Sequence, residues 1–320
     1  MEVPTHGSQA NFIYVAHTPE FGPQIADALA RSRAQNIAFE TAGGTPGWRE
    51  DRSELYSALQ LPSSDPAALA IRAYTLGALK LDDPEHYVPF VLEQLPPTGT
   101  RVHLIDQSKT DPNFLLTHEA ANAAGLYDDQ TPKLPTTVLR IVHDYTARAF
   151  AKSAIRREAT MATQAEGIIG PPEVAAENSI DIVCGAIHTG VEDLMRERGY
   201  STSSTTVGNV RLGTMHKIIK SLQVNPNAAI DPKLADRSIF TQIISKESRD
   251  VVANLPASPD NLLLSQGAEE RIVDKMDDET IAEALAAIDA IKLSGASAEM
   301  KRNHIRYIIG NTTMRAILPS

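Results

Sequence analysis

The chain has 320 residues, 42% hydrophobic and 22% charged, and its formal net charge at pH 7 is −10. This composition is ordinary for a folded globular protein, and the acidic balance argues against a nucleic-acid partner, because phosphate backbones bind basic faces. No apolar run approaches the ~18–20 residues of a membrane-spanning helix. No signal peptide is visible either, so we expect a cytoplasmic protein with no nucleic-acid and no membrane partner.

Short strand-like segments alternate with helical segments along the first two thirds of the chain. Strands are expected at residues 12–16, 36–39, 100–105, 180–188 and 201–207, the last as a polar edge strand. Helices are expected at residues 19–33, 48–61, 66–80, 85–95 and 112–124, followed by a loop at 128–135 and one long helix or two over 137–167. This alternation predicts an α/β fold with a mostly parallel sheet and helices on both faces.

The last third of the chain is helical and nearly strandless. Helices are expected at residues 212–222, 232–253, 268–292 and 298–309. We therefore assign residues 1–210 to an α/β core and residues 211–320 to a helical segment that packs on or caps the core within the same domain. A homodimer through this helical segment is the alternative.

A strand, a corner and a helix meet at His188, in the stretch NSIDIVCGAIHTGVEDLMRERG. Thr189 is expected as the helix N-cap, with Glu192 three residues on as its capping-box partner. His188 would then lie at the carboxyl end of a strand, where open α/β sheets bind ligands. A turn histidine without chemistry is the alternative, and Cys184, the only cysteine, is best explained as a small buried hydrophobic residue.

A second histidine occupies a similar corner. Residues 12–16 end at His17-Thr18, and an amphipathic helix follows. Glu40 and Asp106 end two other predicted strands. Because parallel strands share one carboxyl edge, we expect these polar residues to converge there.

Two histidines and a carboxylate suit a divalent metal, while Glu40 or a histidine could instead act as a general base without one. No sequence-local metal motif such as HExxH or paired CxxC decides between these chemistries. The charged residues 156–158 fit a solvated helix face, or an arginine that holds a substrate carboxylate or an oxyanion.

Several of these motifs resemble the TraB/TIKI group, which is related to the erythromycin esterase and ChaN-like folds. Gly185-Ala186-Ile187-His188 resembles the family's GxxH motif before a late helix, and Glu40 in NIAFET resembles the glutamate that ends the second strand. Arg156-Arg157-Glu158 and Asp106 also resemble family segments. The first motif departs, with Tyr14 in place of a glycine and Val15 where the esterases carry an acidic residue. The resemblance covers residues 12–199.

This resemblance implies a metal-dependent hydrolase that cuts peptide bonds or a small-molecule substrate. It implies manganese, cobalt, zinc or iron held by His17, Glu40 and His188, and we assign catalytic roles to Glu40, His17 and Arg157. Two alternatives remain open. One is a non-catalytic ligand- or haem-binding protein of the ChaN-like type, and the other is a metal-independent Glu/His enzyme of the esterase type.

Overall fold

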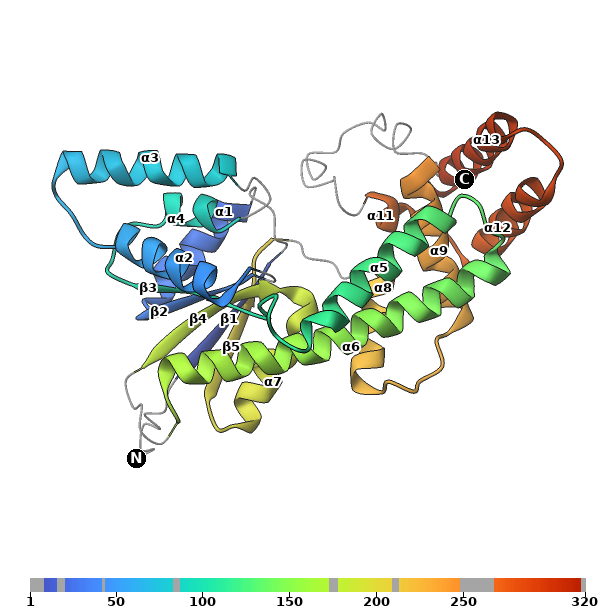
Figure 1. Cartoon of the computed structure of the whole chain (residues 1–320). Helices are drawn as coiled ribbons and strands as arrows, with labels where there is room; N and C mark the ends of the chain where they lie inside the picture. Colours follow the sequence, from blue (N-terminus) through green and yellow to red (C-terminus); the bar gives the residue numbers. More distant parts are fainter. Residues whose placement is uncertain are drawn as a thin grey trace. The chain divides into compact units, whose positions relative to one another are not determined.

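The computed structural model describes residues 9–15, 21–41, 44–82, 87–172, 178–208, 213–247 and 268–317. The chain divides into two compact units, both drawn in Figure 1. The sheet unit comprises Met1–Phe114 and Ala154–Val210, and the helical unit comprises Leu115–Ser153 and Arg211–Ser320. Residues 115–153, expected in the α/β core, thus group with the C-terminal helices.

Five parallel strands form one sheet, so the predicted α/β class with a parallel sheet is confirmed. The strands are β1 (Gln9–Val15), β2 (Asn36–Glu40), β3 (Arg101–Ile105), β4 (Ser179–Gly185) and β5 (Ser201–Thr206). Their order across the sheet is β3-β2-β4-β1-β5. The serines and threonines of β5 are largely exposed at one edge, as expected for a polar edge strand.

Apolar side chains cover both faces of the sheet. In β2, Ile37 and Phe39 join the core on one face, while Ala38 joins the core on the other. This switch follows from the two-residue period of a strand, and apolar residues at successive positions bury both faces. The first core includes helices α1 (Gly22–Ser32), α2 (Pro46–Leu59), α3 (Pro66–Asp82) and α4 (Val88–Gln94); the second includes the C-terminal part of α6 (Thr136–Ile169) and α7 (Gly190–Glu197).

Helix α2 covers the outer edge of β3. Arg49, Ser53 and Ser57 are spaced four residues apart on α2, so they share one face of the helix. The Ser57 hydroxyl accepts a hydrogen bond from the Val102 amide (2.9 Å), and the Ser53 hydroxyl accepts one from the Leu104 amide (3.1 Å). Arg49 donates to the Leu104 carbonyl at 3.0 Å. These bonds satisfy backbone groups that an edge strand would otherwise offer to another chain.

The helical unit has an apolar core of its own. Its helices within the described residues are α5 (Phe114–Gln130), the N-terminal part of α6, α8 (Thr214–Val224), α9 (Pro232–Glu247), α11 (Ala268–Asp274), α12 (Asp278–Leu293) and α13 (Ala298–Ile317). Helix α6 is one continuous helix of 34 residues. The helix expected over 268–292 is two helices, because Asp277 accepts a hydrogen bond from the Thr280 amide and starts α12 there.

Two charged side chains of α12 hold the connection between α5 and α6. Lys292, which is buried, donates to the carbonyls of Thr131 (2.7 Å) and Leu134 (2.8 Å). Burial lowers the pKa of Lys292 to about 8, against the opposing effect of nearby carboxylates. Asp289 accepts from the Thr136 amide at the start of α6 (2.9 Å). The Lys292 cation thus contacts carbonyls that follow α5, and the Asp289 anion contacts the N-terminus of α6. Both arrangements are favoured by the helix dipoles.

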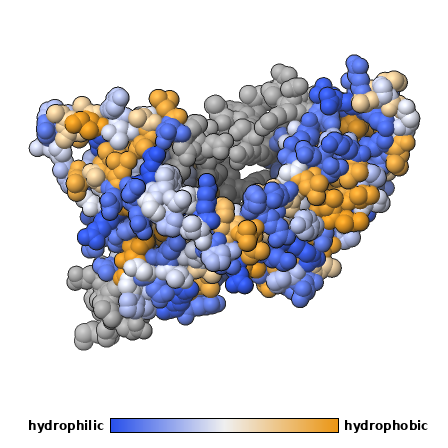
Figure 2. All heavy atoms as spheres, viewed as in Figure 1, coloured by the Kyte–Doolittle hydropathy of each residue, from blue (hydrophilic) through white to orange (hydrophobic). Residues whose placement is uncertain are grey.

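Within the described part of the chain, no helix combines the length and the apolar character needed to cross a membrane. Apolar side chains reach the surface among polar ones, as Figure 2 shows. Ile71 and Leu81 of α3 and Ile141 of α6 are examples. Exposed apolar residues of this kind are normal on a protein surface.

Candidate functional site

Glu40, Asp106 and His188 meet at the carboxyl edge of the sheet, where Arg157 reaches them from α6. The strand register explains the meeting. Glu40 is the last residue of β2 and pairs with Ile105, so Asp106 follows directly beside it. His188 ends a short 3₁₀ turn, Ala186–His188, that follows β4. The other predicted histidine, His17, lies outside the described residues.

The Glu40 carboxylate is buried and has contacts on both oxygens. Its Oε2 accepts a hydrogen bond from the Gly185 amide at 2.7 Å. Its Oε1 accepts one from Arg157 Nη2 at 2.5 Å and lies 3.2 Å from His188 Nε2. Such charge-assisted contacts hold Glu40 in one orientation.

Asp106 is fully buried and has a strained backbone. Its φ of 125° is one that side chains rarely adopt, and strain of this kind costs roughly 1–3 kcal/mol and clusters at functional sites. Gln164 of α6 holds this backbone, accepting from the Asp106 amide at 2.7 Å and donating to its carbonyl at 3.1 Å. Arg49 donates to the same carbonyl.

Arg157 joins the two carboxylates. Its Nε donates to Asp106 Oδ2 at 2.9 Å, and its Nη2 donates to both Asp106 and Glu40. Burial would lower the pKa of Arg157, but these two carboxylates outweigh burial and raise it above its ordinary value. The guanidinium therefore stays charged, and its side chain is 18% exposed, more than the 0% of Asp106 and the 5% of Glu40.

His188 lies between two carboxylates and is only 2% exposed. Its Nε2 faces Glu40, and its Nδ1 lies 3.7 Å from Glu158 Oε1, which is longer than a hydrogen bond but close enough for charge attraction. Burial would lower the pKa of His188, but Glu40 and Glu158 outweigh both burial and Arg157 and raise it to about 9. His188 is therefore an imidazolium at neutral pH.

Glu158 fits beside His188 because residue 190 is a glycine. A Cβ added at Gly190 would lie 2.8 Å from the Glu158 carboxyl carbon, inside contact distance. Three carboxylates thus surround two cations in the cluster of Glu40, Asp106, Arg157, Glu158 and His188, which we call the edge cluster.

Two predictions about this region are wrong in part. Thr189 is the N-cap residue of α7, as predicted, but it makes no side-chain cap, because it continues the preceding turn with helical angles (φ −62°, ψ −18°) instead of extended ones. Glu192, the predicted capping-box partner of Thr189, accepts a hydrogen bond from the Tyr14 hydroxyl at 3.0 Å. Residues 156–158 also do not form one solvated helix face. Arg157 and Glu158 turn inward, whereas Arg156 is exposed.

The donor set of the described residues does not by itself fit a metal ion. No three His, Cys, Asp or Glu side chains within the described ranges are arranged to hold one. Oε1 of Glu40, a predicted ligand residue, already forms an ion pair with the Arg157 guanidinium. The positive charge of this guanidinium repels a metal cation. A metal ion at this edge would therefore need a further ligand from outside the described residues, the place that the prediction gives to His17.

Cys184 is fully buried in the second core, as predicted.

Sequence reasoning missed Gln164 and Arg49, which hold the backbone of Asp106. Gln164 follows Arg157 by seven residues, two helical turns, so both project from one face of α6. That spacing was a usable signal. Arg49 begins the polar stripe of α2 that also contains Ser53 and Ser57, and this four-residue period was the corresponding signal.

Comparison of the chain with protein-family models, with curated proteins and with solved structures found no match in any of the three searches.

Proposed function

We propose that this protein is a hydrolase of ester or peptide bonds in which Glu40 and His188 perform the acid–base chemistry without a metal. The observation that carries the proposal is His188, buried between two carboxylates and beside Arg157 at the edge of the sheet where α/β proteins bind ligands. A buried imidazolium, two carboxylates and an arginine are suited to proton transfer and to stabilising negative charge.

The proposed reaction assigns one role to each group. Arg157, the more exposed member of the pairs, turns from Glu40 toward the substrate carbonyl and stabilises the negative charge that develops on its oxygen. Glu40 then accepts a proton from the water that attacks the carbonyl carbon. His188 donates its proton to the leaving oxygen or nitrogen as the acyl bond breaks.

The contact between Glu40 and His188 completes the cycle. After hydrolysis, Glu40 carries the proton taken from water and His188 is neutral. The 3.2 Å between Glu40 Oε1 and His188 Nε2 is short enough for direct return of that proton. The pKa of about 9 supports His188 as the proton donor at neutral pH.

A metal-dependent hydrolase is the second candidate, and the same contact favours it. Two of the three predicted ligands, Glu40 and His188, present an oxygen and a nitrogen 3.2 Å apart, close enough for both to reach one ion at ~2.0–2.2 Å. In that case Arg157 would leave Glu40, and His17 would complete the set of ligands.

Four further statements remain predictions: membership of the TraB/TIKI group, the metal, the cytoplasmic location and a homodimer.

A panel of ester and peptide substrates tests the proposal, assayed with and without excess chelator. We expect turnover that persists in chelator and falls at least a hundredfold in Glu40→Gln and His188→Ala. His118→Ala is the matched control, since His118 is exposed in the helical unit. Turnover that chelator abolishes, together with loss in His17→Ala, supports the metal-dependent candidate. Full turnover in Glu40→Gln and His188→Ala contradicts both.

A further inference from the structure

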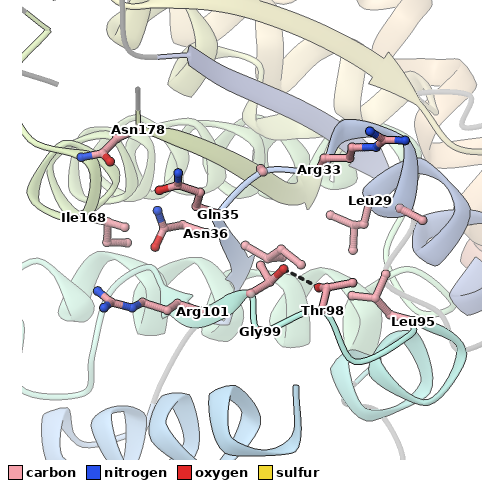
Figure 3. Close-up of a pocket in the computed structure, with 14 residues that line it drawn as sticks. Leu29, Arg33, Gln35, Asn36, Leu95, Thr98, Gly99, Arg101, Ile168 and Asn178 are labelled. Atoms are coloured by element: carbon pink, nitrogen blue, oxygen red, sulfur yellow. Dashed lines mark hydrogen bonds between the residues drawn. The ribbon is translucent and has the colours of Figure 1, made fainter. Parts of the chain in front are cut away.

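A pocket of about 810 Å³ lies at the amino-terminal edge of the sheet, at the other end of the strands from the edge cluster (Figure 3). Asn36 and Arg101 begin β2 and β3, and both line it. Because β2 has five residues, the two edges are about 13 Å apart. Since the pocket lies at the opposite edge, it is separate from the proposed hydrolytic site. Its volume is within the usual range for sites that bind small molecules.

The lining of the pocket is positively charged in an acidic protein. It contains Arg33 and Arg101 but no aspartate or glutamate, although the chain has 40 acidic and 30 basic residues. Among the described residues, neither guanidinium has a carboxylate partner, whereas Arg157 and Arg52 in the same unit each form ion pairs. A concave surface with unpaired positive charge attracts anions.

Arg33 occupies a position that favours glycine. It is the C-cap of α1 and has a φ of 57°, in the left-handed region, with its amide donating to the Leu29 carbonyl at 3.3 Å. Glycine adopts this conformation without steric cost, and an arginine does not. A strained residue whose side chain also lines a pocket is a reason to look for a function of that side chain.

Neutral polar groups accompany the two arginines in the pocket lining. Figure 3 shows Arg33 and Arg101 on opposite sides of the pocket, with their guanidinium groups pointing away from each other and with Gln35 and Asn36 on the side of Arg101. The Asn36 side chain is fixed, because its Oδ1 lies 3.2 Å from His103 Nε2 and its amide donates to the Ser179 carbonyl at 3.3 Å. Both arginines are exposed, so their long side chains can turn toward a ligand.

We propose that this pocket binds a small organic anion with two separated acidic groups, either carboxylates or phosphates. Arg33 holds one acidic group and Arg101 holds the other. Guanidinium groups bind both kinds of oxyanion through paired, charge-assisted hydrogen bonds. Thr98, Thr100 and Gln35 provide hydroxyl and amide groups for the middle of the ligand.

Calorimetric titration of the full chain tests the site with two probes, citrate for carboxylates and fructose 1,6-bisphosphate for phosphates. Sodium chloride at matched ionic strength corrects for screening. We expect saturable binding of at least one probe, weakened about tenfold or more in Arg33→Gly and in Arg101→Ala. Which probe binds distinguishes the two chemistries.

The variants separate binding from folding. Arg33→Gly relieves the left-handed strain, so its thermal midpoint should equal or exceed that of the wild-type protein while its affinity falls. Arg31→Ala is the matched control, because it removes the same charge from an exposed residue of α1 that does not line the pocket. Absence of binding beyond the salt effect for both probes would overturn the proposal, as would an equal loss of affinity in Arg31→Ala.

Discussion

Replacing His188 by glutamine should remove a pH dependence from the stability of the sheet unit. The folded-state pKa of His188 is about 9, against an ordinary value of 6.5. A raised pKa in the folded state stabilises the fold fully below pH 6.5, and this stabilisation is lost as pH rises through about 9. Each unit of pKa corresponds to 1.36 kcal/mol, so the raised pKa contributes about 3 kcal/mol to the free energy of unfolding. Glutamine does not titrate and cannot supply this contribution.

The only tryptophan, Trp48, provides the assay. It lies on α2 in the sheet unit, so its fluorescence during urea unfolding reports on the unit that contains His188. We expect the free energies of unfolding of the wild-type protein and His188→Gln to differ by about 3 kcal/mol at pH 6 and to converge near pH 10. Histidine NMR titration measures the pKa directly. A pKa below 7, or two parallel stability curves, would refute this reasoning.

Three further changes test other contacts. Arg157→Met leaves two buried carboxylates without their shared cation, and we expect it to lower the free energy of unfolding by about 3–5 kcal/mol, measured by tryptophan fluorescence. Gly190→Ala should displace the Glu158 carboxylate and lower the pKa of His188 from about 9, measured by NMR. Lys292→Met removes a donor shared by two carbonyls and should cost about 2 kcal/mol, seen as faster hydrogen exchange in the last turn of α5.

Each of these changes has a matched control in the chain. Arg156→Met removes the same charge from the exposed neighbour of Arg157 and should cost less than about 0.5 kcal/mol. Gly47→Ala adds a methyl group that meets no atom within 4 Å, so the pKa of His188 should not move. Lys275→Met changes an exposed lysine and should leave exchange in α5 unchanged. A control that behaves like its partner would contradict the assigned contact.

The sheet and three members of the edge cluster (Glu40, Asp106 and His188) could be predicted, because the strand pattern is a local property of the sequence. Strands β2 and β4 are buried on both faces, so their apolar runs are visible in the sequence. Parallel topology then dictates that Glu40 and His188 lie at one edge, which the structure shows.

The role of Arg157 could not be predicted in the same way. Which of two adjacent arginines turns inward depends on the rotation of α6 against the sheet, a tertiary property that neither residue encodes. The space that Gly190 leaves for Glu158 is also tertiary, since these residues are 32 positions apart. The helical pattern of residues 115–153 likewise shows that they form helices and does not reveal which core they join.

The interleaving of the two units limits how the protein can be shortened. The chain passes from one unit to the other after residues 114, 153 and 210, so no single cut yields either unit intact. A fragment ending at residue 210 would keep α5 and the first half of α6 but lose the helices that bury Tyr127 and Leu139. Its newly solvent-facing apolar stripe would favour aggregation. Deleting residues 115–153 and joining their flanks with a short flexible loop is the better route to an isolated sheet unit.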